Sequence, residues 1–477
     1  MTLIPDDIKH LNIEKIDFNN HDAIKNLIRI CLNTMESQAH IIEIQTNEIQ
    51  SLKDEINRLK GEKGKPKISP NVPEKEKDTQ NQSTTEKKNW TKSAKKPRIK
   101  IDRTEYKYVD KSILPPDAEY KGYRTVVVQN IKFTTDNVEY KLEFYYSKSE
   151  RKTYEAELPN DIRQEFGTEL KAFIVYLYFD CRVTEHKIKK ILEESGIIIS
   201  EGQISNILTK EKKEEMTKEK EDIFLAGMEH STYLHMDDTG MKHKGINHHL
   251  HVICNALFSV FFIELKKDSK TIKKILGLMD DETLKKILLS DDARQYLGIA
   301  MWHALCWIHE IRLCKKLNPV IEHHRLLLEK FISKLWDYYG KLNDYKDKPD
   351  EKVKEELEKQ FDELFSTKTG YAELDKRIAL SKEKKEELLL VLKFPEIPLH
   401  NNPAELALRE GVVKRKISNG TRSEDGKAAW ENMMSIMDTC RKHGISCFDY
   451  IKDIFSGKRE MTRLSVLIAQ KASANPT

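Results

Sequence analysis

The chain has 477 residues, of which 34% are charged and 39% are hydrophobic, and its formal net charge is only +4. This length predicts about three domains, and the hydrophobic content excludes a chain that is disordered throughout. Because the charges nearly balance, a protein that is basic over its whole surface is excluded, and any nucleic-acid surface must come from local basic clusters.

Residues 1–62 predict a coiled coil. Apolar residues recur at alternating steps of four and three from Ile24 to Leu59, which gives about five heptads. The alternative is a single amphipathic helix packed on its own domain. We favour a homodimer or higher oligomer, because the repeat is close to 3.5 residues. Residues 63–102, rich in Gly, Pro, Lys, Glu and Ser, predict a disordered basic linker.

Residues 103–160 predict a small β-rich unit. RTVVVQNIKF and YKLEFYYS are strand-like and are separated by TTDNVE, so we expect them to pair as a hairpin. The segment contains no cysteine, so the unit is expected to lack zinc ligands. The seven cysteines of the chain are scattered without a Cys-x-x-Cys pair, which indicates a reducing compartment.

Residues 161–228 are helical in pattern. EHKIKKILEESG ends on Gly196, and the next segment opens with Ser200 and Gln203 at the spacing of a capping box. This is the pattern of a helix-turn-helix, a candidate DNA-binding segment, although any two packed helices produce a similar one.

Residues 229–312 and 396–455 predict an α/β domain. Its strands are expected in TYLHM, HLHVICNAL, SVFFIEL, KKILLS and MWHALC, and KHKGINHHLH is expected to hold a hairpin turn. Residues 313–395 are mostly helical and would interrupt this domain, and 456–477 form a C-terminal tail. No signal peptide is evident, and the longest apolar run is too short to span a bilayer. We therefore expect a cytoplasmic protein without a membrane partner.

Three acidic residues stand out in the α/β region. Asp237 ends its first strand, Asp291 ends a later strand, and Glu405 lies in the first turn of a helix. Singly, each has a structural explanation as a turn or capping residue; Glu405 could complete a capping box with Asn402 or pair with Arg409. Together, in this order, they are typical of a ribonuclease-H-like two-metal site, because carboxylate oxygens suit Mg²⁺ or Mn²⁺.

Four segments carry a more specific resemblance. HMDDTG, LLSDDARQY, CWIHEIR and NNPAELALREGVVKRKISNGTRSEDGKAAW resemble the catalytic blocks of bacterial DDE transposases of the insertion sequence 66 family, over roughly residues 160–455. The resemblance implies a ribonuclease-H-like α/β core with a helical insertion. It implies that Asp237, Asp291 and Glu405 are catalytic and hold two Mg²⁺ or Mn²⁺ ions.

The resemblance also implies a reaction and its partners. The expected activity is hydrolysis at the ends of an insertion sequence followed by strand transfer into target DNA, in the bacterial cytosol and at the nucleoid. The coiled coil would pair two protomers on the DNA ends, and accessory proteins from the same element are further candidate partners. Two alternatives stay open: a metal-dependent nuclease that cuts without joining, and a catalytically silent DNA-binding coiled-coil protein.

Further residues are candidates for supporting roles. Asp238 stands where the family commonly has Glu. Asp292 stands where Gly is frequent, so either Asp291 or Asp292 could be the ligand; Asp291 is preferred because it directly follows the strand. The remaining candidates are His309 in a Cys-x-x-His-x-x-Arg stretch with Cys306 and Arg312, Arg409 near Glu405, and a basic group for DNA phosphate, Lys414, Arg415, Lys416 and Arg422.

Overall fold

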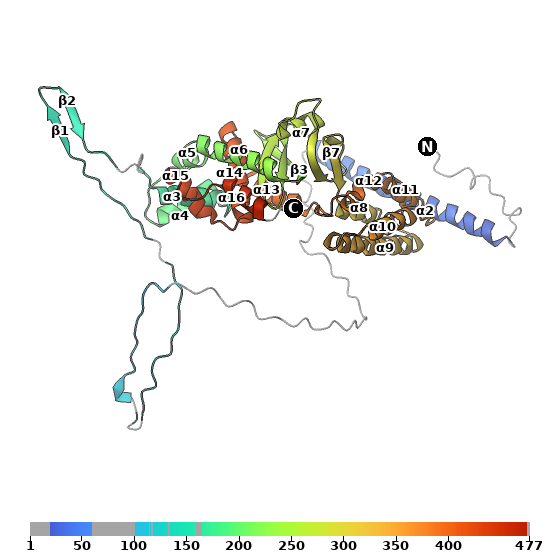
Figure 1. Ribbon diagram of the computed structural model, residues 1–477, viewed down its shortest axis with the longest axis horizontal. Coiled ribbons are helices and arrows are strands. Elements are labelled where there is room, and N and C mark those ends of the chain that lie inside the picture. The colour runs from blue at the N-terminus through green and yellow to red at the C-terminus, as the bar shows by residue number, and fades with distance from the viewer. Residues whose placement is uncertain are drawn as a thin grey trace. The chain divides into compact units, whose positions relative to one another are not determined.

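The computed structural model describes residues 20–59, 101–113, 115, 118–131, 134–158 and 165–474 (Figure 1). Its contacts divide the chain into two compact units, one of residues 1–44 with 134–477 and one of residues 45–133. Most of the predicted linker lies outside the described residues. The elements that position the candidate site all belong to the first unit.

A five-stranded mixed sheet with the order β5-β4-β3-β6-β7 lies at the centre of the first unit (Figure 1). β3 runs antiparallel to β4 and parallel to β6. All five strands were predicted from apolar runs, and the mixed α/β arrangement is compatible with a ribonuclease-H-like core. The strands are β3 (Tyr233–His243), β4 (Ile246–Cys254), β5 (Ser259–Glu264), β6 (Leu284–Ser290) and β7 (Ala300–Leu305).

The first two strands of the sheet form the hairpin predicted for KHKGINHHLH. His243 pairs with Ile246, and the two residues between them, Lys244 and Gly245, both have positive φ angles of 51° and 79°. A two-residue turn with both φ values positive matches the right-handed twist of the strands. The parallel strand β6 follows a crossover that contains α7 (Ser269–Leu276).

After β7 and the helical insertion, the chain forms two helices that pack on the sheet. These are α13 (Asn402–Ser418) and α14 (Glu424–Lys442). The approach of α13 depends on Gly411, since a Cβ atom there would lie 2.5 Å from Cδ2 of Leu250 on β4. Glycine at this position therefore brings α13, and the glutamate in its first turn, close to the strands.

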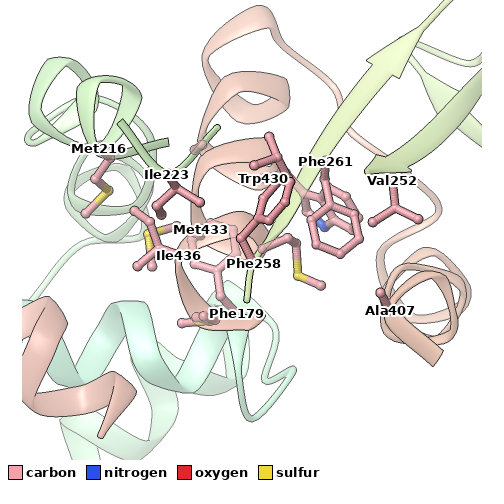
Figure 2. Packing of buried hydrophobic residues seen from close by; sticks show 14 of the residues in the cluster. Phe179, Met216, Ile223, Val252, Phe258, Phe261, Ala407, Trp430, Met433 and Ile436 are labelled. Carbon is pink, nitrogen blue, oxygen red and sulfur yellow. The ribbon is translucent and has the colours of Figure 1, made fainter. Parts of the chain in front are cut away.

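Apolar side chains join these helices to the sheet. Figure 2 shows Trp430 of α14 beside Phe261 of β5, with Val252 of β4 and Ala407 of α13 close by. The Trp430 and Phe261 rings meet edge-to-face at 6.3 Å between centroids. Phe261 and Val252 are fully buried, and each such side chain contributes about 1.5–3 kcal/mol to stability.

In the described residues from 165 onward, four helices lie before the sheet and two more follow α14. Gly196 follows α4 with a φ of 86°, and the Ser200 hydroxyl accepts the N–H of Gln203 at 3.1 Å, as the capping-box spacing predicts. α15 packs on α3, and α16, within the predicted tail, packs on α6. These helices are α3 (Thr168–Phe179), α4 (Glu185–Glu194), α5 (Glu201–Thr209), α6 (Lys213–His230), α15 (Cys447–Ser456) and α16 (Leu464–Ala474).

The segment between β7 and α13 is helical, as predicted, and has its own apolar core. Trp307 is fully buried there, and its indole N–H donates to the Leu388 carbonyl at 2.8 Å. Leu289 of β6 and Ala304 of β7 belong to the same core, so the insertion is built onto the sheet edge. Its helices are α8 (Trp307–Lys315), α9 (Glu322–Asp347), α10 (Glu351–Leu364), α11 (Ala372–Lys382), α12 (Lys385–Leu388) and the short η4 (Leu390–Leu392).

The N-terminal helix α2 (His21–Leu59) packs on this insertion. The Asn33 side chain donates to the Gly370 carbonyl at 2.9 Å and accepts the N–H of Ala372 at 2.8 Å. Glu36 accepts two backbone N–H groups at the start of α9, at 2.6 and 3.0 Å. Neither α9 nor α11 has a side-chain cap of its own, so α2 supplies the missing acceptors.

The region 101–158 differs from its prediction. The described residues there contain a 3₁₀ turn, η2 (Lys111–Ile113), and one hairpin of β1 (Phe144–Ser147) and β2 (Lys152–Glu155). The prediction that RTVVVQNIKF pairs with YKLEFYYS is wrong, because the end of the second segment pairs with the residues after it. The turn between β1 and β2 spans residues 148–151 and is shorter than the TTDNVE loop, so its closure costs slightly less chain entropy.

Candidate active site

Asp237 and Asp291 lie at matching positions on neighbouring strands. β3 and β6 run parallel, and their last paired residues are His235 and Leu289. Each aspartate follows two residues later, Asp237 within β3 and Asp291 directly after β6. The expectation that Asp237 ends its strand is wrong, because β3 continues to His243. Because parallel strands advance together and side chains alternate with a period of two, both carboxylates point to the same face of the sheet, beside the end of β6.

The charges of Asp291 and Glu405 both act on the carboxyl group of Asp237. The pKa of Asp237 is raised from its ordinary value of 3.8 to about 7, chiefly by burial; a backbone hydrogen bond from Asp238 opposes the shift, and the charges of Asp291, Asp238 and Glu405 add to it. Burial also raises the pKa of Asp291, although the nearby His309 opposes that shift. Buried like charges at close range disfavour ionisation unless a cation joins them.

The start of α13 is tied to β3 by Asn401. This residue is fully buried; its side-chain amide donates to the Met236 carbonyl at 2.9 Å, and its oxygen lies 2.8 Å from Nδ1 of His235. Both partners immediately precede Asp237. Asn401 therefore fixes where α13 begins relative to β3, and with it the position of Glu405.

The helix start corrects one detail of the prediction. Asn401 is the N-cap residue and Asn402 is the first helical residue, so the expected capping role of Asn402 is wrong. The Asn401 side chain makes no capping hydrogen bond, because it is used on β3. Its backbone N–H donates to Sγ of Cys306 at 3.2 Å, and Cys306 is buried at the start of α8. Cys306 therefore packs in the core at the junction of α8 and α13.

Glu405 has cationic partners that the sequence did not assign to it. Arg312 of α8 binds it with both prongs, Nη1 to Oε1 at 2.7 Å and Nη2 to Oε2 at 3.2 Å, and Nε2 of His309 lies 3.6 Å from Oε1. Burial acts to raise the pKa of Glu405, but Arg312 and His309 outweigh it, so the pKa is lowered. Arg409, the predicted i,i+4 partner, acts on Glu405 only through its charge.

Asp238 has hydrogen-bond and ion-pair partners of its own. Its side chain is 8% exposed and accepts from Nε2 of Gln295 at 2.8 Å, with Nζ of Lys267 at 3.4 Å and Nδ1 of His249 at 3.5 Å. Adjacent residues of a strand point to opposite faces. Asp237 and Asp238 therefore occupy different environments, one facing carboxylates and the other facing donors.

Asp292 is directed toward the helical insertion. Its carboxylate forms an ion pair with Lys384, which precedes α12. Asp291 instead accepts the N–H of Ala293 at 3.3 Å and shares its surroundings with His309. The placement of the two side chains favours Asp291 as the partner of Asp237.

The four basic residues of α13 and the following loop do not share one environment. Lys414 is 3% exposed; its ammonium donates to the Tyr178 carbonyl at 3.0 Å and lies 3.3 Å from the centre of that ring, and burial lowers its pKa to about 8. Lys414 therefore attaches α13 to α3, and its buried ammonium group is not accessible to a phosphate. Lys416 and Arg422 are exposed, and Arg415 is half-buried.

The donors of the site suit a hard cation, although their present arrangement does not enclose one. Within the part of the chain that the structure describes, no three His, Cys, Asp or Glu side chains are arranged to hold a metal ion. In this arrangement both oxygens of Glu405 accept hydrogen bonds from Arg312. The chemistry of the set still fits Mg²⁺ or Mn²⁺, since its donors are carboxylates from two strands and a helix, and the charges of Asp291 and Glu405 both act on Asp237.

Comparisons with known proteins cover this region. A family model described as "Transposase IS66 family" matches residues 163–429, a span that contains all three carboxylates. A protein of Sinorhizobium fredii (strain NBRC 101917 / NGR234), "Uncharacterized protein y4jO", is 39% identical over 198 residues. That match covers 41% of this chain and 60% of the relative. Among the described helices, none is both long and apolar enough to cross a membrane.

Proposed function

The chain belongs to the IS66 transposase family, and from that premise we propose that it catalyses transposition of an insertion sequence. The substrate is DNA: the reaction hydrolyses phosphodiester bonds at the element ends and joins the freed 3′ hydroxyl to target DNA. One observation carries the proposal: Asp237 and Asp291 lie at matching positions on the neighbouring parallel strands β3 and β6, and the charges of Asp291 and Glu405 both raise the pKa of Asp237.

The three carboxylates would hold the metal ions. Asp237 and Asp291 would bind them from the strands, and Glu405 would complete the second site. When bound, two divalent ions activate an attacking hydroxyl and stabilise the leaving oxygen of a phosphodiester. Asn401 positions Glu405 by joining the start of α13 to β3, and Asp238 is anchored by Gln295 behind the strand.

DNA binding is proposed for two surfaces that α13 connects. Arg415, Lys416 and Arg422 follow the catalytic helix and would contact phosphates. The helix-turn-helix-like pair α4 and α5 would add a second contact. Lys414 lies between the two surfaces. It attaches α13 to Tyr178 of α3, the helix that directly precedes α4 in the chain. The same proposal includes action in the bacterial cytosol and at the nucleoid. It also includes accessory proteins from the same element as partners.

Self-association through α2 is proposed alongside. One face of the helix packs on the insertion through Asn33 and Glu36. Heptad positions on another face remain exposed, with Met35 at 58% and Leu52 at 57%. A second copy of α2 would bury these exposed positions in a coiled coil. The face with Asn33 and Glu36 would stay packed on the insertion of its own chain.

Substitution of Asp237 tests the function. The full chain is incubated with Mg²⁺, a duplex carrying labelled element ends and a circular target, and cleaved and joined products are measured separately. Asp237→Asn is expected to lower both by at least about 100-fold, because metal stabilisation of the transition state is worth several kcal/mol. Asp281→Asn, an exposed aspartate in the loop before β6, is the matched control.

The outcomes separate the alternatives. Cleavage without joined product, sensitive to Asp237→Asn, favours the nuclease that does not transfer strands. Cleavage that Asp237→Asn leaves unaltered, or DNA binding without any cleavage, contradicts the catalytic assignment and favours the DNA-binding scaffold.

A further inference from the structure

Arg312 is the cation that occupies the candidate site in this structure. Its guanidinium bonds to both oxygens of Glu405. Among the described residues, no ion pair within 4.0 Å joins a cationic side chain to Asp237 or Asp291. The guanidinium of Arg312 is thus directed at Glu405, the carboxylate on helix α13, and not at the two aspartates on the strands.

The pair lies at the open edge of the site. The Arg312 side chain is 46% exposed and that of Glu405 is 28% exposed. The backbone that carries Arg312 is fixed, because Ile311 and Cys314 on the same helix are 1% exposed. The guanidinium can therefore change its partner by rotation of the side chain alone, without movement of α8.

A phosphodiester offers Arg312 an equivalent partner. The two-pronged guanidinium fits the paired oxygens of a carboxylate and those of a phosphate alike. Water offers no such pair, so leaving Glu405 is costly in the free protein and much less costly when a phosphate lies at the site. Glu405 would then have both oxygens free of Arg312, with only His309 at 3.6 Å and the charge of Arg409 left to offset its own.

We propose that Arg312 is a substrate-operated latch, which holds Glu405 in the DNA-free protein and passes to a phosphate of bound DNA, freeing Glu405 to bind the second cation. The inference rests on the proposed function and adds an order of events to it. DNA binds first and the second cation follows, so the site is completed only on substrate. If bound DNA tightens binding of the second cation by some factor, thermodynamic linkage requires the cation to tighten DNA binding by that same factor.

Binding of Mn²⁺, measured by electron paramagnetic resonance on the full chain, tests the latch without any turnover. Without DNA, Arg312→Gln is expected to tighten binding of the second ion about fivefold or more, the usual lower range of such coupling. Addition of a duplex oligonucleotide should tighten it similarly in the unsubstituted chain and have little effect in Arg312→Gln. Arg312→Lys keeps the charge but not the two prongs and should fall between. Lys316→Gln, an exposed charge at the end of the same helix, should match the unsubstituted chain.

A second measurement tests the phosphate contact alone. With EDTA present, the affinity for the duplex is followed against salt concentration, and Arg312→Gln is expected to reduce the salt slope by about one. An unchanged slope, or Mn²⁺ affinity that is unchanged or weaker in DNA-free Arg312→Gln, overturns the latch. Loss of cleavage in Asp237→Asn would still support the proposed function in that case, so the two ideas fail separately.

Discussion

The two sides of the candidate site neutralise their charge in opposite ways. On the strand side, Asp237 and Asp291 are half-buried carboxylates whose pKa values are raised, chiefly by burial. On the helix side, burial of Glu405 is outweighed by Arg312 and His309, and its pKa is lowered. One side therefore favours protonation, while the other favours a charged carboxylate in an ion pair.

The difference teaches which parts of the site depend on a ligand. The strands fix Asp237 and Asp291 through the ladder, so these carboxylates meet whether or not a cation is present. Helix α13 supplies a carboxylate whose partner can be exchanged, because both members of the pair are partly exposed. Burial of the two aspartates on the strand side lowers the stability of the folded protein when they are charged, and a bound cation would offset this. On the helix side, Arg312 already offsets the charge of Glu405.

Neutralising Asp237 gives the largest expected effect on stability. With its pKa raised in the folded state, Asp237 contributes stability that is fully present below 3.8 and is lost as pH rises through about 7. Asp237→Asn removes that loss and should raise the stability of the metal-free protein at pH 8 by roughly 2 kcal/mol, after discounting for partial exposure. Thermal unfolding in EDTA at several pH values measures it, with Asp281→Asn as the control.

The pH profile makes this prediction specific. The advantage of Asp237→Asn over the unsubstituted chain should grow between about pH 4 and pH 7 and stay level above that. A variant that is less stable at pH 8, or equally stabilised at pH 4 and pH 8, would show that like-charge burial does not govern the strand side.

Neutralising Glu405 should have the opposite sign and a smaller size. Glu405→Gln breaks the two-pronged bond and leaves Arg312 and His309 without their carboxylate. Because Arg312 is nearly half exposed, the loss at pH 7 should stay below about 1 kcal/mol. The lowered pKa of Glu405 means that its contribution is present above its ordinary value of 4.5 and disappears as pH falls. A gain in stability at pH 7 would remove the contrast between the two sides.

The strand side was predictable from sequence and the helix side only in part. Apolar runs located the five strands, and the acidic residues that follow the runs pointed to Asp237 and Asp291, although β3 continues past Asp237 to His243. The roles of Arg312 and Asn401 escaped, because each acts on a residue far along the chain and no local period links them. Lys414 looked like its basic neighbours in sequence, yet the fold buries it against Tyr178. In 101–158, strand propensity alone chose a hairpin partner that the shorter turn overrides.

The smallest expected effect belongs to Asp292, and it decides between two adjacent residues. Asp292 pairs with Lys384 of the insertion, and both side chains are roughly one quarter to one third exposed, so Asp292→Asn should cost about 1 kcal/mol or less and leave Mg²⁺-dependent cleavage within about twofold. Asp291→Asn should instead lower cleavage by at least about 100-fold, as removal of a metal ligand does. Both variants, assayed beside Lys384→Gln, separate the ion pair from the metal site. Equal losses in the two aspartate variants would mean that the insertion, through Lys384, takes part in holding the strand side together.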